Sequence, residues 1–556
     1  MKVSRKRYIV CLLFSSLIFV FLTSSVHAGQ IKVIDKGYKA VRLAADTLFP
    51  GVNGATIGAD GNLYVTHTGN SSVTKIDLKT MKAKPFVQSY KGAYIIDDIA
   101  ADDKGNFYAT GTTPLVGEVY RFDKNGMKTV IASGIPGANG IEYNKRTNRL
   151  FVTECFQGNR VFEIDPQGVK QPRLLIDKNV IPVPEGFDYD PDTNDLIIPD
   201  LGTGKILRVN PDTGAISTVV EKLAAPIALV VGPDKMVYVP SLTGVVYRVS
   251  LDGAKVETIA KLMPGLDNVT ITKKGRLFVT SYWDATIFEV ATDGSGKLKQ
   301  LFPKGPNQPL GIVVKDGKVL VADAIMIRNF VNGKFEPTKL NAWAAHGMPL
   351  PLSLADGPGG QVFWTDCIHG AACIGDPLKG EFKPVAGGLN RPMTSMMSPA
   401  GDALYVAEYG DGQITRVSLK DGAKSVLAKD LEGPIALAMI GDTLYVAESK
   451  PGRISKIDPA SGKKEVFLSS MVGKPLALAN DGKQHLLVLD GAGHKILRVN
   501  PKTLAMSTLA INVPVEYGSI GSYPSVEFPA PMTVAENGDI YLTTANRGAI
   551  KLQKLK

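Results

Sequence analysis

A pattern of four short strands that returns about every 42 residues is the feature that most constrains this fold. In one copy, the turn Gly137-Ala138-Asn139-Gly140 leads into a short apolar stretch. A strong strand follows at Leu150-Phe151-Val152-Thr153, and the next stretch, Val161–Asp165, alternates apolar and polar residues. Other copies add a fourth, outer strand such as Ser217–Val220. Four short antiparallel strands in each unit are typical of a propeller blade.

One position, which we call the slot, lies at the start of the first strand of every unit. In the first six units the slot holds Asn53, Asp97, Asn139, Glu185, Ile227 and Asp267, and in the next six it holds Leu310, Leu352, Met393, Ile435, Leu476 and Met532. Twelve units exceed the roughly 4–8 blades of a single propeller. We therefore predict an all-β chain with two tandem six-bladed β-propellers, and the change from polar to apolar slots marks the division.

The predicted chain has three parts: a signal peptide at 1–28, a first propeller at 29–295 and a second propeller at 296–556. The first part has a basic start, an apolar run from Tyr8 to Phe21, and a small-residue cleavage site at Val26-His27-Ala28. An uncleaved N-terminal anchor is the alternative. No later segment is long and apolar enough to span a bilayer. We therefore expect a periplasmic or secreted protein.

The two ends of the chain suggest how the rings close. A strand-like segment, Lys39–Leu43, precedes the first unit, and the last unit ends after its third strand. We expect the N-terminal strand to complete the sixth blade and Leu298–Phe302 to complete the twelfth, which leaves no exposed sheet edge. The boundary between the propellers then falls near residues 292–296. An irregular insertion at 513–529 is a candidate lid or inter-domain contact.

Charge and cysteine content limit the partners. The formal net charge is +10, and removal of the four basic residues of the signal leaves +6. The basic residues are scattered through turns, so we expect no nucleic-acid partner. Cys367 and Cys373 are predicted to form a disulfide in an oxidising compartment. They form an incomplete metal site with His369, and Cys155 is interpreted as a small buried residue.

The polar slots of the first six units are predicted to converge on one channel, because the innermost strands of a propeller line its axis. Three carboxylates that converge repel one another unless they are protonated or bridged by a cation. Carboxylate and amide oxygens suit Ca²⁺ best, with Zn²⁺, Mn²⁺ and Mg²⁺ as alternatives. Turn capping by Asn and Asp is the simpler explanation. The apolar slots of the second half show that the turn itself does not require a polar residue.

Two blades resemble a known family. Asn139-Gly140-Ile141 with Leu150–Thr153 is similar to the central blade motif of the senescence-marker-protein/gluconolactonase/luciferin-regenerating-enzyme family. Leu266–Thr270 with Gly275–Val279 resembles its later metal-bearing blade. In that family a Glu, an Asn and an Asp hold one divalent ion in the channel of a six-bladed propeller. The repeats also resemble NHL, strictosidine-synthase-like and streptogramin-lyase-like propellers.

The resemblance implies that Asn139 and Asp267 are metal ligands, with Asp97 or Asp98 at a neighbouring ligand or substrate position. The chain departs from the family pattern in the first blade, where Asn53 stands in place of the early Glu, and after Asp267, where Asn268 replaces the usual Gly. Glu185 is inferred to supply the missing carboxylate. The predicted site therefore comprises the metal ligands Asn139, Glu185 and Asp267, the catalytic residues Asp97, Glu185 and Asp267, and the substrate-binding residues Asn53, Asp98 and Asn268.

The second propeller has a proline before each of its six apolar slots. Core packing is one interpretation, and an apolar pocket or a surface that binds another protein is the other. Trp343, His346 and Met348 lie in a connection that could border such a site.

Two hypotheses for the function follow. The first is an exported, metal-dependent enzyme that hydrolyses a small-molecule lactone or ester, or that acts as a lyase, with a ring carboxylate as general base. The second is a non-catalytic periplasmic binding or scaffold protein whose propeller loops bind a partner.

Overall fold

The computed structural model describes residues 31–43, 48–69, 71–88, 95–112, 116–155, 157–307, 309–323, 325–341, 348–367, 369–469, 472–515, 532–544 and 548–555. Every regular element within these ranges is a β-strand. None of the described residues forms a helix with the length and apolar character needed to cross a membrane. The predicted signal peptide, Trp343, His346 and most of the insertion at 513–529 lie outside the described residues.

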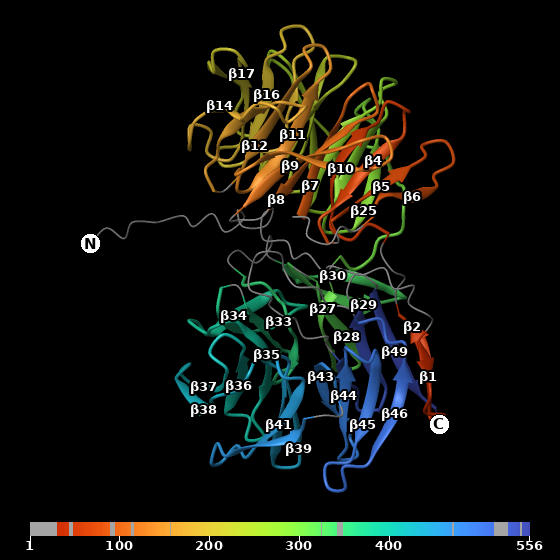
Figure 1. The fold of residues 1–556 in the computed structure, drawn as a ribbon, viewed down its shortest axis with the longest axis vertical. Helices are drawn as coiled ribbons and strands as arrows, with labels where there is room; N and C mark the ends of the chain where they lie inside the picture. Colours follow the sequence, from red (N-terminus) through yellow and green to blue (C-terminus); the bar gives the residue numbers. More distant parts are fainter. Residues whose placement is uncertain are drawn as a thin grey trace, which may run out of the picture. The chain divides into compact units, whose positions relative to one another are not determined.

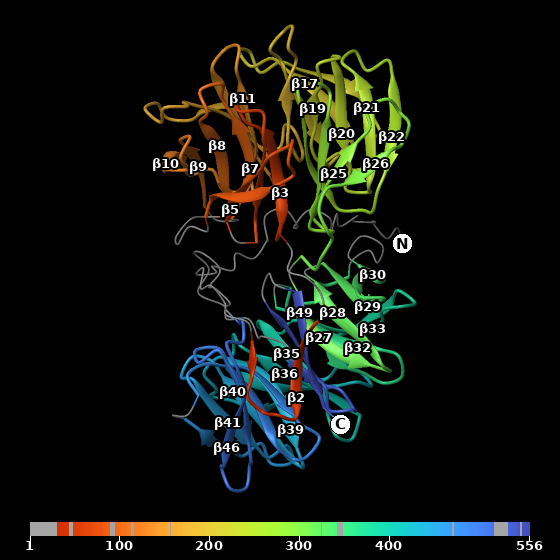
Figure 2. The ribbon, with the colours of Figure 1, turned by 90° about the vertical axis from the view of Figure 1, so that its right-hand side faces the viewer.

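The first propeller, or first ring, has six antiparallel sheets of four strands, each in chain order from the inside outward. Its strands are β3 (Val52–Ile57), β4 (Leu63–His67), β5 (Ser72–Ile76), β6 (Ala83–Val87), β7 (Ile95–Ala101), β8 (Phe107–Thr112), β9 (Gly117–Phe122), β10 (Lys128–Ser133), β11 (Ala138–Asn144), β12 (Arg149–Glu154), β13 (Val161–Ile164), β14 (Arg173–Ile176), β15 (Asp188–Tyr189), β16 (Leu196–Asp200), β17 (Lys205–Val209), β18 (Ile216–Val220), β19 (Val230–Val231), β20 (Met236–Pro240), β21 (Val245–Ser250), β22 (Val256–Lys261), β23 (Leu266–Ile271), β24 (Leu277–Ser281), β25 (Thr286–Val290) and β26 (Leu298–Gln300). The inner strands β3, β7 and β11 lie side by side (Figure 2).

The second propeller, or second ring, repeats this architecture in blades seven to twelve. Its strands are β27 (Pro309–Lys315), β28 (Lys318–Asp323), β29 (Met326–Val331), β30 (Lys334–Asn341), β31 (Ala355–Asp356), β32 (Val362–Asp366), β33 (Ala371–Asp376), β34 (Glu381–Ala386), β35 (Pro392–Met397), β36 (Ala403–Glu408), β37 (Gln413–Ser418), β38 (Lys424–Ala428), β39 (Pro434–Ile440), β40 (Thr443–Glu448), β41 (Arg453–Ile457), β42 (Lys464–Leu468), β43 (Pro475–Asn480), β44 (Leu486–Asp490), β45 (Lys495–Val499), β46 (Met506–Ile511), β47 (Met532–Val534), β48 (Ile540–Thr544) and β49 (Gly548–Lys554). Two N-terminal strands, β1 (Lys32–Val33) and β2 (Tyr38–Arg42), join this ring. The predicted fold of two six-bladed propellers is confirmed.

The predicted exchange of closing strands is wrong. β2 pairs with β49, from Tyr38 opposite Lys554 to Arg42 opposite Ile550, so the N-terminal strand completes blade twelve instead of blade six. β26 pairs with β25 of its own blade. The reason is local: one short turn connects β25 to β26, so the edge of blade six is already covered, whereas β49 has no following strand to cover it.

The first ring is therefore inserted into the second. Residues 48–307 form one compact unit, and residues 31–43 belong with those from 309 onward to the other. The junction lies at residues 307–309 and not near 295. Figure 1 shows β1 and β2, drawn in red, beside the blue strands β46 and β49 of the second ring.

The hydrophobic core of each ring lies between neighbouring blades, where the faces of adjacent sheets pack. Blades six and one illustrate this packing: Phe278 and Ile287 form one buried cluster with Leu63 and Val65. Burial of these faces removes apolar surface from water, which is the main driving force for the fold. Packing between side chains therefore closes the first ring without a shared strand.

The predicted disulfide between Cys367 and Cys373 is wrong, because both cysteines are buried and free. In the hairpin of β32 and β33, Cys373 lies opposite Trp364, three residues before Cys367. Three residues of extended chain separate the two positions by about 10 Å. A disulfide needs Cα atoms within roughly 7 Å, so the register of the hairpin keeps the two thiols apart.

Candidate functional site: the polar channel of the first ring

The slots of the first ring coincide with irregularities in the inner strands. The register between the first and second strands shifts after Val52, Ile96, Ala138 and Leu266, each of which lies at or directly before a slot. Such a bulge leaves the slot residue and the residue after it outside the regular ladder. Two successive residues in each of these blades are thereby released from the ordinary alternation of the strand.

Threonines in the second strands hold the slots in place. The Thr110 hydroxyl donates to the Asn139 carbonyl of the next blade at 2.6 Å, and the Thr280 hydroxyl donates to the Asn53 carbonyl at 2.7 Å. Thr66 bonds the Asp97 carbonyl, and Thr153 bonds the Glu185 carbonyl, in the same way. These threonines end the strong strand in four of the first six units, so their repetition was a signal that the sequence contained.

The structure brings Asn53, Asp97, Glu185 and Asp267 together. The Asn53 Nδ2 atom donates to Asp97 Oδ1 at 2.9 Å. Burial raises the pKa of Asp97 well above its usual range, and the nearby carboxylates of Asp267 and Asp98 raise it further. Burial likewise raises the pKa of Glu185, with added repulsion from Asp267 and Asp97. Carboxylates that influence one another in this way share one site.

Two carboxylate oxygens in this site have no partner among the described residues. They are Asp97 Oδ2 and Glu185 Oε1, both fully buried. The two residues are each 1% exposed. A buried polar atom that lacks a hydrogen bond costs free energy. A proton or a cation at this place in the channel would remove that cost.

Asn139 and Asp267 differ from the other slots, because both are only half-buried. Burial and the charge of Asp98 raise the pKa of Asp267 to about 7. Their greater exposure indicates that these two side chains border the more open part of the channel.

Asp98 and Asn268 bond to each other across the ring. The Asn268 Nδ2 atom donates to Asp98 Oδ1 at 2.8 Å, and the backbone N–H of Ile141 donates to Asp98 Oδ2 at 3.1 Å. Burial raises the pKa of Asp98 to about 7. Gly54 of blade one makes room for the bridge, since a Cβ atom there would lie 2.6 Å from Asp98 Oδ1. Both residues, predicted to bind substrate, thus have protein partners.

Two further acids, Glu142 and Asp188, were not predicted from the sequence. Glu142 lies three residues after the slot residue Asn139, and Asp188 lies three residues after the slot residue Glu185. Side chains two residues apart share a strand face, so each acid shares a face with the residue that directly follows the slot. Asp188 accepts hydrogen bonds from the backbone N–H groups of Val231 and Tyr189 at 2.8 and 2.7 Å. Burial raises the pKa of Asp188 to about 6, and burial with repulsion from Asp188 raises that of Glu142.

Three other buried residues of the first ring, His67, Glu154 and Cys155, have structural roles. His67 is buried, its Nε2 atom lies 2.8 Å from the Thr74 hydroxyl, and burial lowers its pKa to about 3. Glu154 forms an ion pair with Arg160. Cys155 is buried, which raises the pKa of its thiol and makes it a poor nucleophile.

Among the described residues, no group of three or more His, Cys, Asp and Glu side chains has a metal-binding arrangement. A cation in the channel would therefore need the Asn139 amide, backbone oxygens or water in addition to carboxylates. Oxygen donors of this mixture are those that hard divalent ions accept. The two unpartnered carboxylate oxygens are consistent with such an ion.

The slots of the second ring have the opposite character. Its slot residues are all apolar and buried. Met348 is also buried, in a hydrophobic cluster with Trp364. Buried carboxylates occur instead at the ends of the second strands, where they have partners: Glu448 pairs with Arg453 and accepts the backbone N–H of Glu432, each at 2.7 Å. This arrangement supports core packing as the role of the apolar slots.

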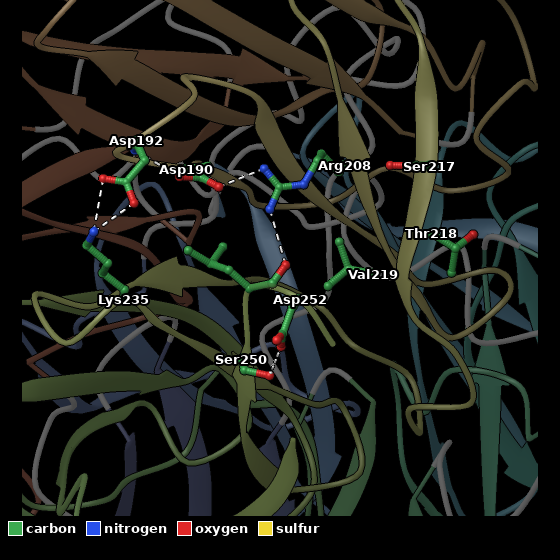
Figure 3. Close-up of a pocket in the computed structure, with 10 residues that line it drawn as sticks. Asp190, Asp192, Arg208, Ser217, Thr218, Val219, Lys235, Ser250 and Asp252 are labelled. Carbon is green, nitrogen blue, oxygen red and sulfur yellow. Dashed lines mark hydrogen bonds and ion pairs between the residues drawn. The ribbon is translucent and has the colours of Figure 1, made fainter. Parts of the chain in front are cut away.

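A groove of about 540 Å³ lies on the side of the first ring, between blades four and five (Figure 3). Arg208 lies 2.6 Å from Asp190 of its own blade and bonds the Leu251 carbonyl of blade five, and Lys235 of blade five lies 2.7 Å from Asp192 of blade four. The groove contains none of the predicted site residues. The charged side chains of the groove thus link two neighbouring blades.

No protein-family model matches the chain. A gluconolactonase from Zymomonas mobilis subsp. mobilis is 25% identical over 201 residues, which cover 32% of this chain and 53% of the gluconolactonase. The match thus spans about half the length of that relative.

Solved structures with a similar fold share less sequence. A catalytically inactive virginiamycin B lyase from Staphylococcus aureus, solved with quinupristin, is 19% identical, with a TM-score of 0.38 and coverage of 51% of this chain and 96% of the lyase. A GH74 xyloglucanase from Xanthomonas campestris is 11% identical, with a TM-score of 0.43 and coverage of 93% of this chain and all of the xyloglucanase (100%). The strand order and the gluconolactonase match together support a gluconolactonase-like β-propeller family for this chain.

Proposed function

We propose that the first ring contains the active site of an exported enzyme that uses a divalent cation to hydrolyse a small lactone or ester. The observation that carries this proposal is the pair of buried, unpartnered oxygens, Asp97 Oδ2 and Glu185 Oε1. Two such atoms in one site are costly unless a cation or protons compensate them. The gluconolactonase relative favours a lactone as the substrate class.

The residues of the channel fit such an ion. The Glu185 carboxylate and the Asn139 amide oxygen would hold it, with water in the remaining positions. A bound divalent ion would polarise the carbonyl oxygen of a substrate. Ca²⁺ suits an all-oxygen site best, and Mn²⁺, Mg²⁺ and Zn²⁺ are alternatives to be compared.

Asp267 is the carboxylate best placed to act as general base. It is half-buried, whereas Asp97 and Glu185 are each 1% exposed. A substrate or water molecule in the open part of the channel therefore reaches Asp267 most easily. As a general base, Asp267 would remove a proton from the attacking water during hydrolysis. In a lyase, the same carboxylate would remove an acidic C–H proton.

The test begins with protein stripped of metal by EDTA. Hydrolysis of a panel of aldonolactones and aryl esters is then followed by proton release, with Ca²⁺, Mn²⁺, Mg²⁺ or Zn²⁺ added separately. We expect cation-dependent hydrolysis, and we expect Asp267→Asn to lower kcat by roughly 10²–10⁴-fold, as loss of a general base does.

Asp192→Asn is the matched control, because Asp192 lies in the groove on the side of the same ring. Its rate is expected to equal that of the wild type. Wild-type protein that binds none of the four ions would contradict the proposal.

A further inference from the structure

We infer that Asp97 is a ligand of the channel cation, in addition to Glu185 and Asn139, and that Asn53 is its positioning residue. This inference rests on the proposed function, because it assigns a ligand to the cation proposed there. It decides between the roles predicted for Asp97, which were a catalytic acid or base and a ligand or substrate position, and it changes the role of Asn53, which was predicted to contact substrate.

The hydrogen bond between the two side chains carries the argument. The Asn53 Nδ2 atom donates to Asp97 Oδ1 at 2.9 Å, while Asp97 Oδ2 has no partner among the described residues. Asn53 is 3% exposed and Asp97 is 1% exposed, so water does not freely replace either contact. A donor that holds one carboxylate oxygen orients the other, as residues behind metal ligands commonly do.

Backbone contacts fix both residues. The Thr280 hydroxyl donates to the Asn53 carbonyl at 2.7 Å, and the Thr66 hydroxyl donates to the Asp97 carbonyl. Each threonine comes from the blade before the residue that it holds. The backbones of the pair are thus held by contacts from blades six and one, and rotation of the Asp97 carboxylate would break its hydrogen bond from Asn53.

Comparison with Asp98, the next residue in β7, explains why Asp97 is the residue assigned as the ligand. Asp98 uses both oxygens within the protein, since Oδ1 accepts from Asn268 Nδ2 and from the Ile99 backbone at 2.8 Å each, and Oδ2 accepts from the Ile141 backbone. Asp97 uses only one. Of the two adjacent carboxylates, Asp97 alone offers an oxygen that the described residues leave unpartnered.

The experiment uses the full chain, stripped of metal, with Ca²⁺ binding measured by titration calorimetry and Tb³⁺ luminescence lifetimes measured in H₂O and D₂O. Asp97→Asn is expected to lower Ca²⁺ affinity by more than about 100-fold and to add about one water to bound Tb³⁺, because water replaces the lost ligand. Asn53→Ala is expected to lower affinity by roughly 10–100-fold, as loss of a residue behind a ligand does.

Asp98→Asn is the matched control: it removes one charge from the same strand without removing an unpartnered oxygen. It is expected to weaken binding less than Asp97→Asn and to leave the number of bound waters unchanged. Circular dichroism and the Tm in EDTA verify that each variant folds. If Asp97→Asn does not fold, Asn53→Ala and its Tb³⁺ hydration decide the question.

The outcomes separate the two proposals. A wild type that binds neither Ca²⁺ nor Tb³⁺ overturns the cation-dependent function and this inference with it. A wild type that binds, with Asp97→Asn unchanged in affinity and hydration, overturns this inference alone. Unchanged affinity in folded Asn53→Ala overturns the positioning role of Asn53.

Discussion

The two rings have the same blades but opposite interiors. In the second ring the slots are buried apolar side chains, and its buried acids have close partners, as Glu448 has in Arg453. In the first ring the slots are mostly acids and amides, and Asp97 and Glu185 each retain an unpartnered oxygen. The second ring shows that the fold does not require polar slots. The cost of the polar slots in the first ring is therefore better explained by function than by folding.

The rings also close differently. Side-chain packing joins blades six and one, as in the Phe49 and Phe302 rings, whose centroids lie 4.7 Å apart. In the second ring the N-terminal strand β2 pairs along β49 and completes blade twelve. A segment that precedes the first ring in the sequence thus stabilises the second.

Deletion of residues 31–43 tests this difference and has the largest expected effect. The deletion removes all five residues of β2. Each backbone hydrogen bond between β2 and β49 contributes about 1 kcal/mol, and β2 also buries apolar surface, so the second ring should be destabilised by roughly 5 kcal/mol. Differential scanning calorimetry should show a lower Tm for one transition only. A shift in the transition of the first ring, identified by limited proteolysis, would contradict the closure by β2.

A carboxylate placed in an apolar slot should be the next most damaging change. Leu476 is 2% exposed, and Leu476→Glu buries a charge that has no partner. We expect the second ring to lose about 4 kcal/mol of stability in urea unfolding, in the range for an uncompensated buried charge. Leu476→Met is the control, expected to cost less than about 1.5 kcal/mol. A tolerated Leu476→Glu would mean that the slots of both rings accept charge equally.

Replacement of a polar slot residue by an apolar one should stabilise the first ring. In EDTA, Glu185→Leu removes a buried carboxyl group with an unpartnered oxygen, and we expect a gain of about 2 kcal/mol. Glu185→Gln keeps the shape and still leaves a polar atom unpartnered, so its gain should be smaller. The same Leu variant should lose any stabilisation by added Ca²⁺. Urea unfolding with and without Ca²⁺ measures both effects, and a destabilised Glu185→Leu variant would show that the carboxylate has a structural role.

The stabilities of the two rings should change with pH in opposite directions. The contribution of the single carboxylate considered in each ring is the smallest of the expected effects. Burial raises the pKa of Asp188 from 3.8 to about 6, so its contribution to stability is present below pH 4 and is lost as pH rises to about 6. The part of the loss that is due to Asp188 should be roughly 1–2 kcal/mol, and the raised pKa values of Asp98 and Asp267 act in the same direction. The pKa of Glu448 is lowered, with Arg453 as the main favourable partner, so its contribution is lost as pH falls below about 4.5.

Separate Tm values for the two rings between pH 3 and 8, measured in EDTA, provide the check. Asp188→Asn should make the Tm of the first ring less dependent on pH between 4 and 6, without changing the profile of the second ring. A first ring whose stability rises from pH 4 to 6 would contradict the raised pKa of Asp188.

The sequence by itself determined the repeat, the number of blades, the division into two rings and the contrast between their slots. These features follow from local periodicity: strand alternation and turn residues act within each unit of about 40 residues. The slot contrast located Asn53, Asp97, Glu185 and Asp267, which the structure brings together. The second pair of acids, Glu142 and Asp188, required knowledge of the bulges that set which strand faces point into the channel.

Only the tertiary structure decided the closure of the rings, the fate of the cysteines and the partners of the polar residues. Closing strands such as β2 and β26 have similar local patterns, and the choice between them depends on which sheet edge is already covered. The register of β32 and β33 keeps Cys367 and Cys373 apart. The bond between Asp98 and Asn268 joins residues 170 positions apart in the sequence. Such pairings depend on long-range geometry, which no single repeat contains.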